Sequence, residues 1–100
     1  MYKILITSSN QYNTLKKISF DLVNTRLSPC THIIKDVESF YLWDGEMVNG
    51  VENLLLIKCN DQNVGKIKTI IYANHNYTLP EIICHEFNIV SKKYKKWFDE

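Results

Sequence analysis

Three side chains that can exchange protons or bind a ligand fall within seven positions, in the segment HNYTLPEI at residues 75–82. His75, Tyr77 and Glu81 supply an imidazole, a phenol and a carboxylate, which are groups used in acid–base chemistry and ligand recognition. The same segment has the composition of a turn, because Asn and His can end a helix and Pro80 favours an extended chain before it. The segment therefore predicts a turn between a helix and a strand, with a role in a cleft as the functional alternative.

The three cysteines, Cys30, Cys59 and Cys84, are far apart and form no CxxC pair. An odd number without metal-ligand spacing is typical of reduced thiols in the cytoplasm. Cys30 follows Pro29 at the start of an expected strand, where a thiol is a packing residue more often than a nucleophile. The sequence contains no glycine-rich phosphate loop, GxSxG or HExxH motif. We therefore expect no enzymatic activity.

The hydrophobic pattern predicts alternating strands and helices. Apolar residues at three- and four-residue spacing indicate two helices, and runs rich in β-branched and aromatic residues indicate strands. The dipeptide Asp44-Gly45 is a favoured hairpin turn between the two longest strands, and Asn49-Gly50 is interpreted as a bulge or kink within the second of them. The expected elements are a strand over 2–7, a helix over 11–27 ended by Pro29, strands over 30–44 and 46–60, a helix capped by Asp61 and ending near Asn74, a strand over 80–90 and a helix over 91–100.

This order predicts an α+β fold, a ferredoxin-like β-α-β-β-α-β sandwich with a long β-hairpin and a short C-terminal helix. Right-handed crossovers place both main helices on one face of a four-stranded antiparallel sheet. A sheet with one open face should alternate apolar and polar residues, but residues 4–6 and 54–57 are apolar throughout. The second face therefore requires a cover, which further copies of the chain can provide in a closed ring. We expect an obligate oligomer, with a trimer as its size.

Length and charge restrict the class of protein. One hundred residues form a single domain over 1–100, and a net charge of +1 gives no field that would favour nucleic acid. No apolar run is long enough for a signal peptide or a membrane span. The four lysines between residues 92 and 96 are interpreted as a solvated helix face. We expect a cytoplasmic protein without a nucleic-acid or membrane partner.

Five segments share a combination of aromatic and charged residues: RLSPC at 26–30, YLWDGE at 41–46, ENLLLIKC at 52–59, HNYTLPEI at 75–82 and YKKWF at 94–98. Together they resemble the CutA family, which is named for divalent-cation tolerance, and they cover nearly the whole chain. The resemblance implies a ferredoxin-like subunit that assembles through long hairpins as a homotrimer, similar to the trimers of the PII signalling proteins. It also implies a role in tolerance of copper or another divalent metal, with no established reaction.

The resemblance also implies positions for metal ligands. In copper-binding members, a cysteine at the end of the first strand and the histidine of a His-Pro-Tyr motif have been taken as ligands, sometimes with a second histidine before it. The matching positions hold Ile6, His75 and Asn74, so one imidazole remains. Because a transition metal needs several nitrogen or sulfur donors, we expect Cu²⁺ or another divalent cation to bind only weakly at an isolated His75, unless trimer symmetry gathers three copies of one residue. His32 and His85 are the residues that could assist His75, but each is expected to lie on a strand, satisfied or solvated.

Six polar residues match the family pattern and form a candidate cleft between subunits. The cleft has two interpretations: its charges stabilise the trimer, or they bind a small anionic ligand, as in a PII-like sensor. The family has proline where Asn76 stands and usually glutamate where Thr78 stands, which predicts a looser turn with one carboxylate fewer. The candidate cleft residues are Arg26, Glu52, Lys58, His75, Tyr77 and Glu81.

The aromatic residues of the hairpin and the tail are interpreted as packing residues. Tyr41, Trp43 and Trp97 have rings that can stack on a base or sugar, but aromatics that alternate along a hairpin more often fill an interface. We expect all three in the trimer interface or core, with Tyr94 and Trp97 docking the tail helix. The sequence thus predicts a trimeric divalent-metal tolerance protein, with a PII-like sensor as the alternative.

Overall fold

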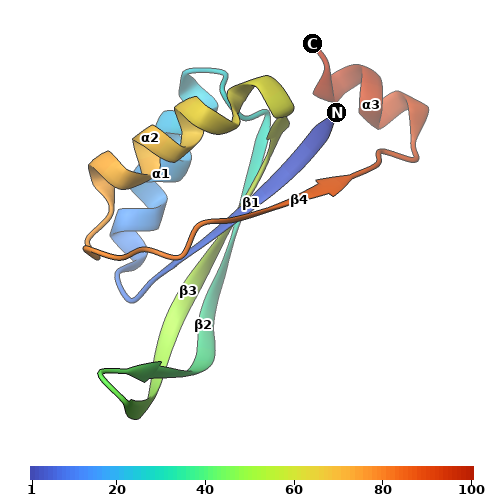
Figure 1. The fold of residues 1–100 in the computed structure, drawn as a ribbon. Coiled ribbons are helices and arrows are strands. Elements are labelled where there is room, and N and C mark those ends of the chain that lie inside the picture. The colour runs from blue at the N-terminus through green and yellow to red at the C-terminus, as the bar shows by residue number, and fades with distance from the viewer.

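The computed structural model describes residues 1–100 and has the predicted order of strands and helices (Figure 1). The strands form one antiparallel sheet in the order β2-β3-β1-β4, which is the ferredoxin-like arrangement expected from the crossovers. Helices α1 and α2 lie side by side on one face of the sheet, and α3 lies on the other side, near the N-terminus (Figure 1). The elements are β1 (Tyr2–Ser9), α1 (Tyr12–Asn24), β2 (Cys30–Trp43), β3 (Glu46–Asn60), a 3-10 turn (Asp61–Asn63), α2 (Val64–Asn74), β4 (Ile83–Phe87) and α3 (Lys92–Phe98).

The hydrophobic core lies between α1, α2 and the sheet. On β3, Leu55, Ile57 and Cys59 are buried at every second position, because alternate side chains of a strand point to opposite faces. The two helices contribute apolar stripes at the spacing that predicted them. The core consists of Leu5, Leu15, Ile18, Leu22, Leu55, Ile57, Cys59, Ile67 and Ile71. These contacts cover one face of the sheet only.

The second face of the sheet, which we call the open face, is apolar at its centre. Ile6 on β1 lies opposite Leu56 on β3 and Ile83 on β4, and Leu54 lies opposite Ile34 on β2. Ile34 and Ile83 are 47% and 53% exposed. The prediction of strands that are apolar on both faces is therefore confirmed, and the trimer that would cover the open face stays a prediction.

Helix α3 packs on one end of the open face through Phe98. The side chain of Phe98 is 1% exposed, and its ring centroid lies 5.2 Å from that of Tyr2 and 6.1 Å from that of Phe87. Trp97 is 47% exposed and lies beside Tyr94, with ring centroids 5.4 Å apart. Within the single chain Phe98 docks the tail helix, and Tyr94 assists, since its hydroxyl accepts from Lys58 at 3.3 Å. The contact of Trp97 in a trimer stays a prediction.

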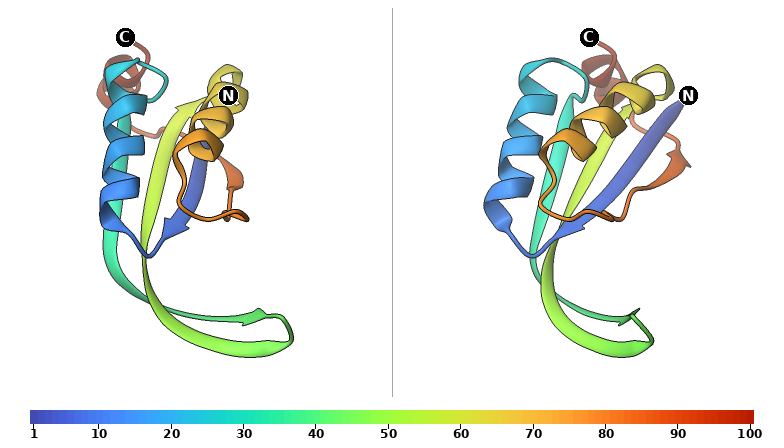
Figure 2. Two further views of the ribbon diagram at one scale, coloured as in Figure 1. Left: turned by 90° about the vertical axis from the view of Figure 1, so that its left-hand side faces the viewer. Right: turned by 60° about the vertical axis from the view of Figure 1, so that its left-hand side comes forward.

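Strands β2 and β3 continue beyond the rest of the sheet as a two-stranded hairpin. Pairing of β1 with β3 stops at Ser9 and Asn53, so residues 37–43 and 46–52 pair only with each other. Asp44 and Gly45 have φ angles of 51° and 77°, as the predicted two-residue turn requires. Figure 2 shows the hairpin curving beneath the body of the molecule, below the loop between α2 and β4.

The irregularity in the hairpin lies on β2 and not at Asn49-Gly50. The register shifts between residues 34 and 37, where Asp36 has a φ of 60°, a conformation that Asp adopts more readily than most residues. Asn53 holds this bulge at the end of β1, since its side chain donates to the carbonyl of Ser9 at 3.1 Å and accepts from the amide of Asp36 at 3.3 Å. The predicted bulge at Asn49-Gly50 is therefore wrong, because the bend forms where β1 ends.

Several element ends differ from the predicted ones. Helix α1 ends at Asn24, and the chain turns at Arg26, with a φ of 62°, before it reaches Pro29. Asp61 begins a 3-10 turn and makes no side-chain cap for α2. Strand β4 is shorter than predicted, because the residues next to Pro80 belong to the loop. None of the helices has the length and apolar character needed to cross a membrane.

Candidate ligand cleft and metal donors

A cleft of about 810 Å³ lies between the curved hairpin and the loop that joins α2 to β4. Tyr41, Trp43 and Val48 line it from the hairpin, and Tyr77 and Leu79 line it from the loop. Both views in Figure 2 show the hairpin bending under this loop, so residues distant in the sequence face one another. Tyr41 and Trp43 remain 44% and 53% exposed, and their contacts in a trimer stay a prediction.

Tyr77 connects the loop to the hairpin and to the end of β1. Its hydroxyl donates a 2.7 Å hydrogen bond to the carboxylate of Glu52 and accepts a 2.8 Å bond from the amide of Asn10. Burial, followed by the bond to Glu52, raises the pKa of Tyr77 to about 12, because both favour the neutral phenol. The hydroxyl therefore stays protonated near neutral pH and acts as a structural link.

His75 has both ring nitrogens engaged within the chain. Nδ1 accepts a 3.0 Å bond from the amide of Tyr77, so the ring proton lies on Nε2, which donates to the carbonyl of Ser8 at 2.8 Å. Burial lowers the pKa of His75, although the bond to Ser8 and the charge of Glu52 act in the opposite direction. This neutral imidazole has no free lone pair for a metal ion. In this conformation His75 holds the turn.

Asn76 closes the same turn against the segment that leads into α1. Its side-chain amide donates to the side-chain oxygen of Asn10 at 2.9 Å and accepts from the hydroxyl of Ser9 at 2.5 Å. Ser9 is fully buried, and its hydroxyl oxygen also accepts from the amide of Gln11 at 3.0 Å. The predicted loosening of the turn is therefore wrong, because the asparagine side chain forms bonds that a proline lacks.

The charged groups that line the cleft are all carboxylates. Glu38, Glu52 and Glu81 line it, and no lysine or arginine does. The hydroxyl of Ser8 donates to Glu81 at 3.4 Å, which ties the start of β4 to β1. Such a lining favours a cation or a neutral polar ligand over an anion. However, the chain contains no group of three or more His, Cys, Asp or Glu side chains placed to hold a metal ion.

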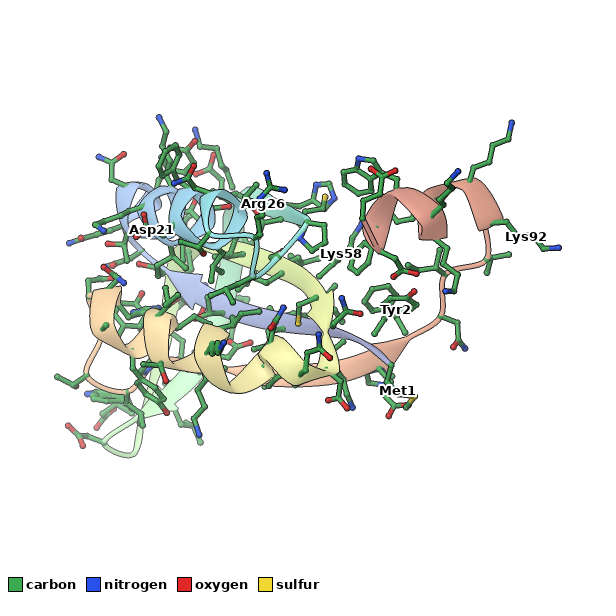
Figure 3. All side chains as sticks on the ribbon, turned by 90° about the horizontal axis from the view of Figure 1, so that it is seen from above. Met1, Tyr2, Asp21, Arg26, Lys58 and Lys92 are labelled. Carbon is green, nitrogen blue, oxygen red and sulfur yellow. The ribbon has the colours of Figure 1, made fainter.

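Arg26 and Lys58 lie at the opposite end of the sheet, toward α3 (Figure 3). Lys58 is six residues from Glu52 on β3, which corresponds to about 20 Å along an extended strand. Its ammonium group donates to the hydroxyl of Tyr94 at 3.3 Å, and Arg26 is exposed beyond the end of α1. The single chain therefore brings together four of the six predicted cleft residues: Glu52, His75, Tyr77 and Glu81.

The three cysteines occupy different environments. Cys59 is fully buried, and burial raises the pKa of its thiol to about 11, whereas Cys84 is exposed. Cys30 is half-buried, with its sulfur 3.6 Å from Nε2 of His32. His85 instead donates from Nδ1 to the backbone carbonyl of the next residue at 2.6 Å. The sequence analysis did not predict the Cys30–His32 pair. Its signal is the two-residue spacing on a strand, which puts both side chains on one face.

Comparisons with known proteins identify relatives over nearly the whole chain. Residues 3–100 match the family model described as CutA1 divalent ion tolerance protein. The divalent-cation tolerance protein CutA of Thermus thermophilus is 34% identical over 97% of the chain and 93% of its own length. The chloroplastic protein CutA of Arabidopsis thaliana is 33% identical over 82% of the chain, which spans 45% of that relative.

Solved structures with these names have the same fold. The divalent cation tolerance protein from Thermus thermophilus superimposes with a TM-score of 0.91 at 31% identity, over 98% of this chain and 95% of that one. CutA from Xylella fastidiosa gives a TM-score of 0.90 at 28% identity, over 98% of this chain and 94% of the other. The α+β fold derived above is therefore also that of these relatives.

Proposed function

Because the chain belongs to the CutA1 divalent ion tolerance family, we propose that it acts in divalent-cation tolerance as a homotrimer that performs no reaction of its own. One observation supports the proposal of a homotrimer: the open face of the sheet is apolar, whereas α1 and α2 cover the other face. Contiguous exposed apolar surface of this kind is typical of contacts between proteins. Further copies of the same chain are the occupants that a closed ring would supply.

The outer side of the hairpin needs a cover for the same reason. Leu42, Met47 and Val51 are between 61% and 75% exposed, and Leu42 lies directly opposite Met47. A two-stranded hairpin that extends beyond its sheet is only marginally stable alone. Contact with neighbouring copies would bury these side chains and hold the hairpin in its curved shape.

Light scattering on the wild-type chain at micromolar concentration tests the assembly. We expect a mass three times that of the 11.8 kDa chain. Leu42→Lys should reduce the mass toward one chain, because it would bury an unpaired charge in the contact. Phe20→Lys is the matched control, since Phe20 is 67% exposed on α1, away from the hairpin, and should leave the mass unchanged. A wild-type mass of a single chain would contradict the homotrimer.

A small anionic ligand, as in PII-like signalling, is the second candidate. Arg26, Lys58 and the four lysines of α3 favour it at the end of the sheet opposite the cleft. The carboxylates Glu38, Glu52 and Glu81 do not favour an anion in the cleft itself. We therefore rank a divalent cation ahead of an anionic metabolite as the ligand.

Thermal unfolding with added ligands separates the two candidates. A ligand at a hundred times its Kd adds about 2.7 kcal/mol to the free energy of unfolding. We expect stabilisation by Cu²⁺ or Zn²⁺ and none by nucleotides or organic acids. Stabilisation by an anion alone, abolished in Lys58→Gln, would favour the PII-like alternative.

We place the protein in the cytoplasm because its three cysteines are unpaired, and a reducing compartment preserves such thiols. A relative from Archaeoglobus fulgidus is described as periplasmic, and the Arabidopsis relative as chloroplastic. Cell fractionation is therefore the direct test, and recovery outside the cytoplasm would contradict this assignment.

A further inference from the structure

Cys30 and His32 stand together at the start of β2, on the open face of the sheet. Cys30 pairs with Lys58 across the strands and His32 pairs with Leu56, so both backbones are fixed in the sheet. Ser28 adds to this, because its buried hydroxyl donates to the carbonyl of Lys58 at 2.6 Å and accepts from the amide of Cys30 at 3.3 Å. The strand therefore holds the two residues on the same face, two positions apart.

The distance between the two donor atoms matches that of a shared metal ion. Sγ of Cys30 and Nε2 of His32 are 3.6 Å apart. A zinc ion with a bond of about 2.3 Å to sulfur and about 2.0 Å to nitrogen at a tetrahedral angle holds these atoms about 3.5 Å apart. The side chains therefore need almost no movement to accept such an ion.

We propose that Cys30 and His32 form a binding site for a thiophilic divalent ion of the zinc class. The ion bonds to Sγ, whose thiol proton passes to water, and to Nε2 of the neutral imidazole, whose remaining proton stays on Nδ1. Thiolate and imidazole donors select zinc-like ions over Ca²⁺ and Mg²⁺, which prefer oxygen. This inference rests on the proposed role in divalent-cation tolerance and assigns that role a pair of ligands separate from His75.

No other thiol of the chain has this arrangement. Cys59 is fully buried in the core. Cys84 is exposed, but its sequence neighbour His85 points to the opposite face of β4, since adjacent residues of a strand alternate. With two protein donors, the ion at Cys30 and His32 keeps further positions for water or for donors from another copy at the open face.

Cobalt titration of the full chain, in a buffer with a non-chelating reductant, tests the proposal. Co²⁺ substitutes for Zn²⁺, and its bond to a thiolate gives a charge-transfer absorption in the near ultraviolet. We expect this band in the wild type and its loss in Cys30→Ser. His32→Asn should raise the apparent Kd for Co²⁺ by at least about 100-fold. Mutation of a residue that only hydrogen-bonds to a ligand lowers metal affinity by about 10- to 100-fold, and loss of a direct ligand should lower it at least as much. Cys84→Ser and His85→Asn are the matched controls and should bind like the wild type.

Nitrogen NMR of the wild type provides a second readout that requires no variant to fold. Added Zn²⁺ should shift the Nε2 resonance of His32 and leave those of His75 and His85 in place. Absence of the cobalt band, its persistence in Cys30→Ser, or a zinc shift at His75 instead of His32 would overturn the site. Light scattering on the same samples keeps the two proposals separate: a monomer with the band refutes the homotrimer alone, and a trimer without it refutes the site alone.

Discussion

Replacement of Tyr77 by phenylalanine tests whether its hydroxyl holds the loop to the hairpin. The change removes the bonds to Glu52 and Asn10 but keeps the ring, whose centroid lies 4.9 Å from that of His75. A hydrogen bond to a charged group contributes about 1.5–3 kcal/mol, and a neutral one about 1 kcal/mol. Because Asn10 is exposed, water can replace its bond, so we expect the free energy of unfolding to fall by about 2 kcal/mol.

Urea denaturation followed by circular dichroism measures this loss. All samples need the same protein concentration, since the stability of an oligomer depends on it. Tyr72→Phe is the matched control, because Tyr72 is 55% exposed on α2, and its loss of a hydroxyl should change the free energy by less than about 0.5 kcal/mol. If Tyr77→Phe unfolds at the same urea concentration as this control, the hydroxyl does not hold the loop.

The same hydroxyl predicts a dependence on alkaline pH. The folded-state pKa of Tyr77, about 12, lies above the value of about 10 expected in the unfolded chain. The stability contributed by the protonated hydroxyl is therefore complete below pH about 10 and is lost as the pH rises toward 12. The difference in free energy of unfolding between the wild type and Tyr77→Phe should shrink over this range. A difference that stays constant would refute the assignment of the shift to Tyr77.

Three further changes have expected outcomes. Burial lowers the pKa of His75 below its usual 6.5. The stability that the neutral imidazole contributes is therefore present above that pH and is lost as the pH falls through the folded pKa. In urea denaturation, the wild type should lose stability relative to His75→Gln below pH 6.5. Phe98→Ala should cost about 3 kcal/mol and Trp97→Ala less than about 1 kcal/mol, and equal melting temperatures would contradict the burial difference. Gly45→Ala should cost about 1 kcal/mol because its φ is 77°, whereas Gly50→Ala has open space and should stabilise by about 0.5 kcal/mol; denaturation midpoints that move together would refute this contrast.

The order of elements is predictable because it depends on local patterns. Apolar periodicity locates α1 and α2, and Asp44-Gly45 fixes the hairpin turn through backbone preferences of those two residues alone. The apolar open face can also be predicted from the sequence. In an apolar run such as residues 54–57, alternate side chains point to opposite faces, so both faces of the strand are apolar. These features need no knowledge of which strands are neighbours.

The candidate site is less predictable because it depends on register. Glu52 and Lys58 are close in sequence, yet the extended strand separates them, while the loop after α2 brings Tyr77 to Glu52. The bulge at Asp36 likewise depends on where β1 ends and on the two bonds of Asn53, which belong to other strands. Such contacts can be predicted from a sequence only when the pairing of its strands is already known.

The three histidines show that a motif does not by itself identify a metal ligand. His75 lies in the segment that resembles the family, but the fold uses both of its nitrogens to hold a turn. His85 donates from Nδ1 to a backbone carbonyl, and the neighbouring Cys84 lies on the other face of its strand. His32 lies outside the segments that carry the resemblance, yet its Nε2 faces the thiol of Cys30. His32 is thus the histidine whose ring nitrogen lies beside a thiol, and that second donor distinguishes it from His75 and His85 as a candidate metal ligand.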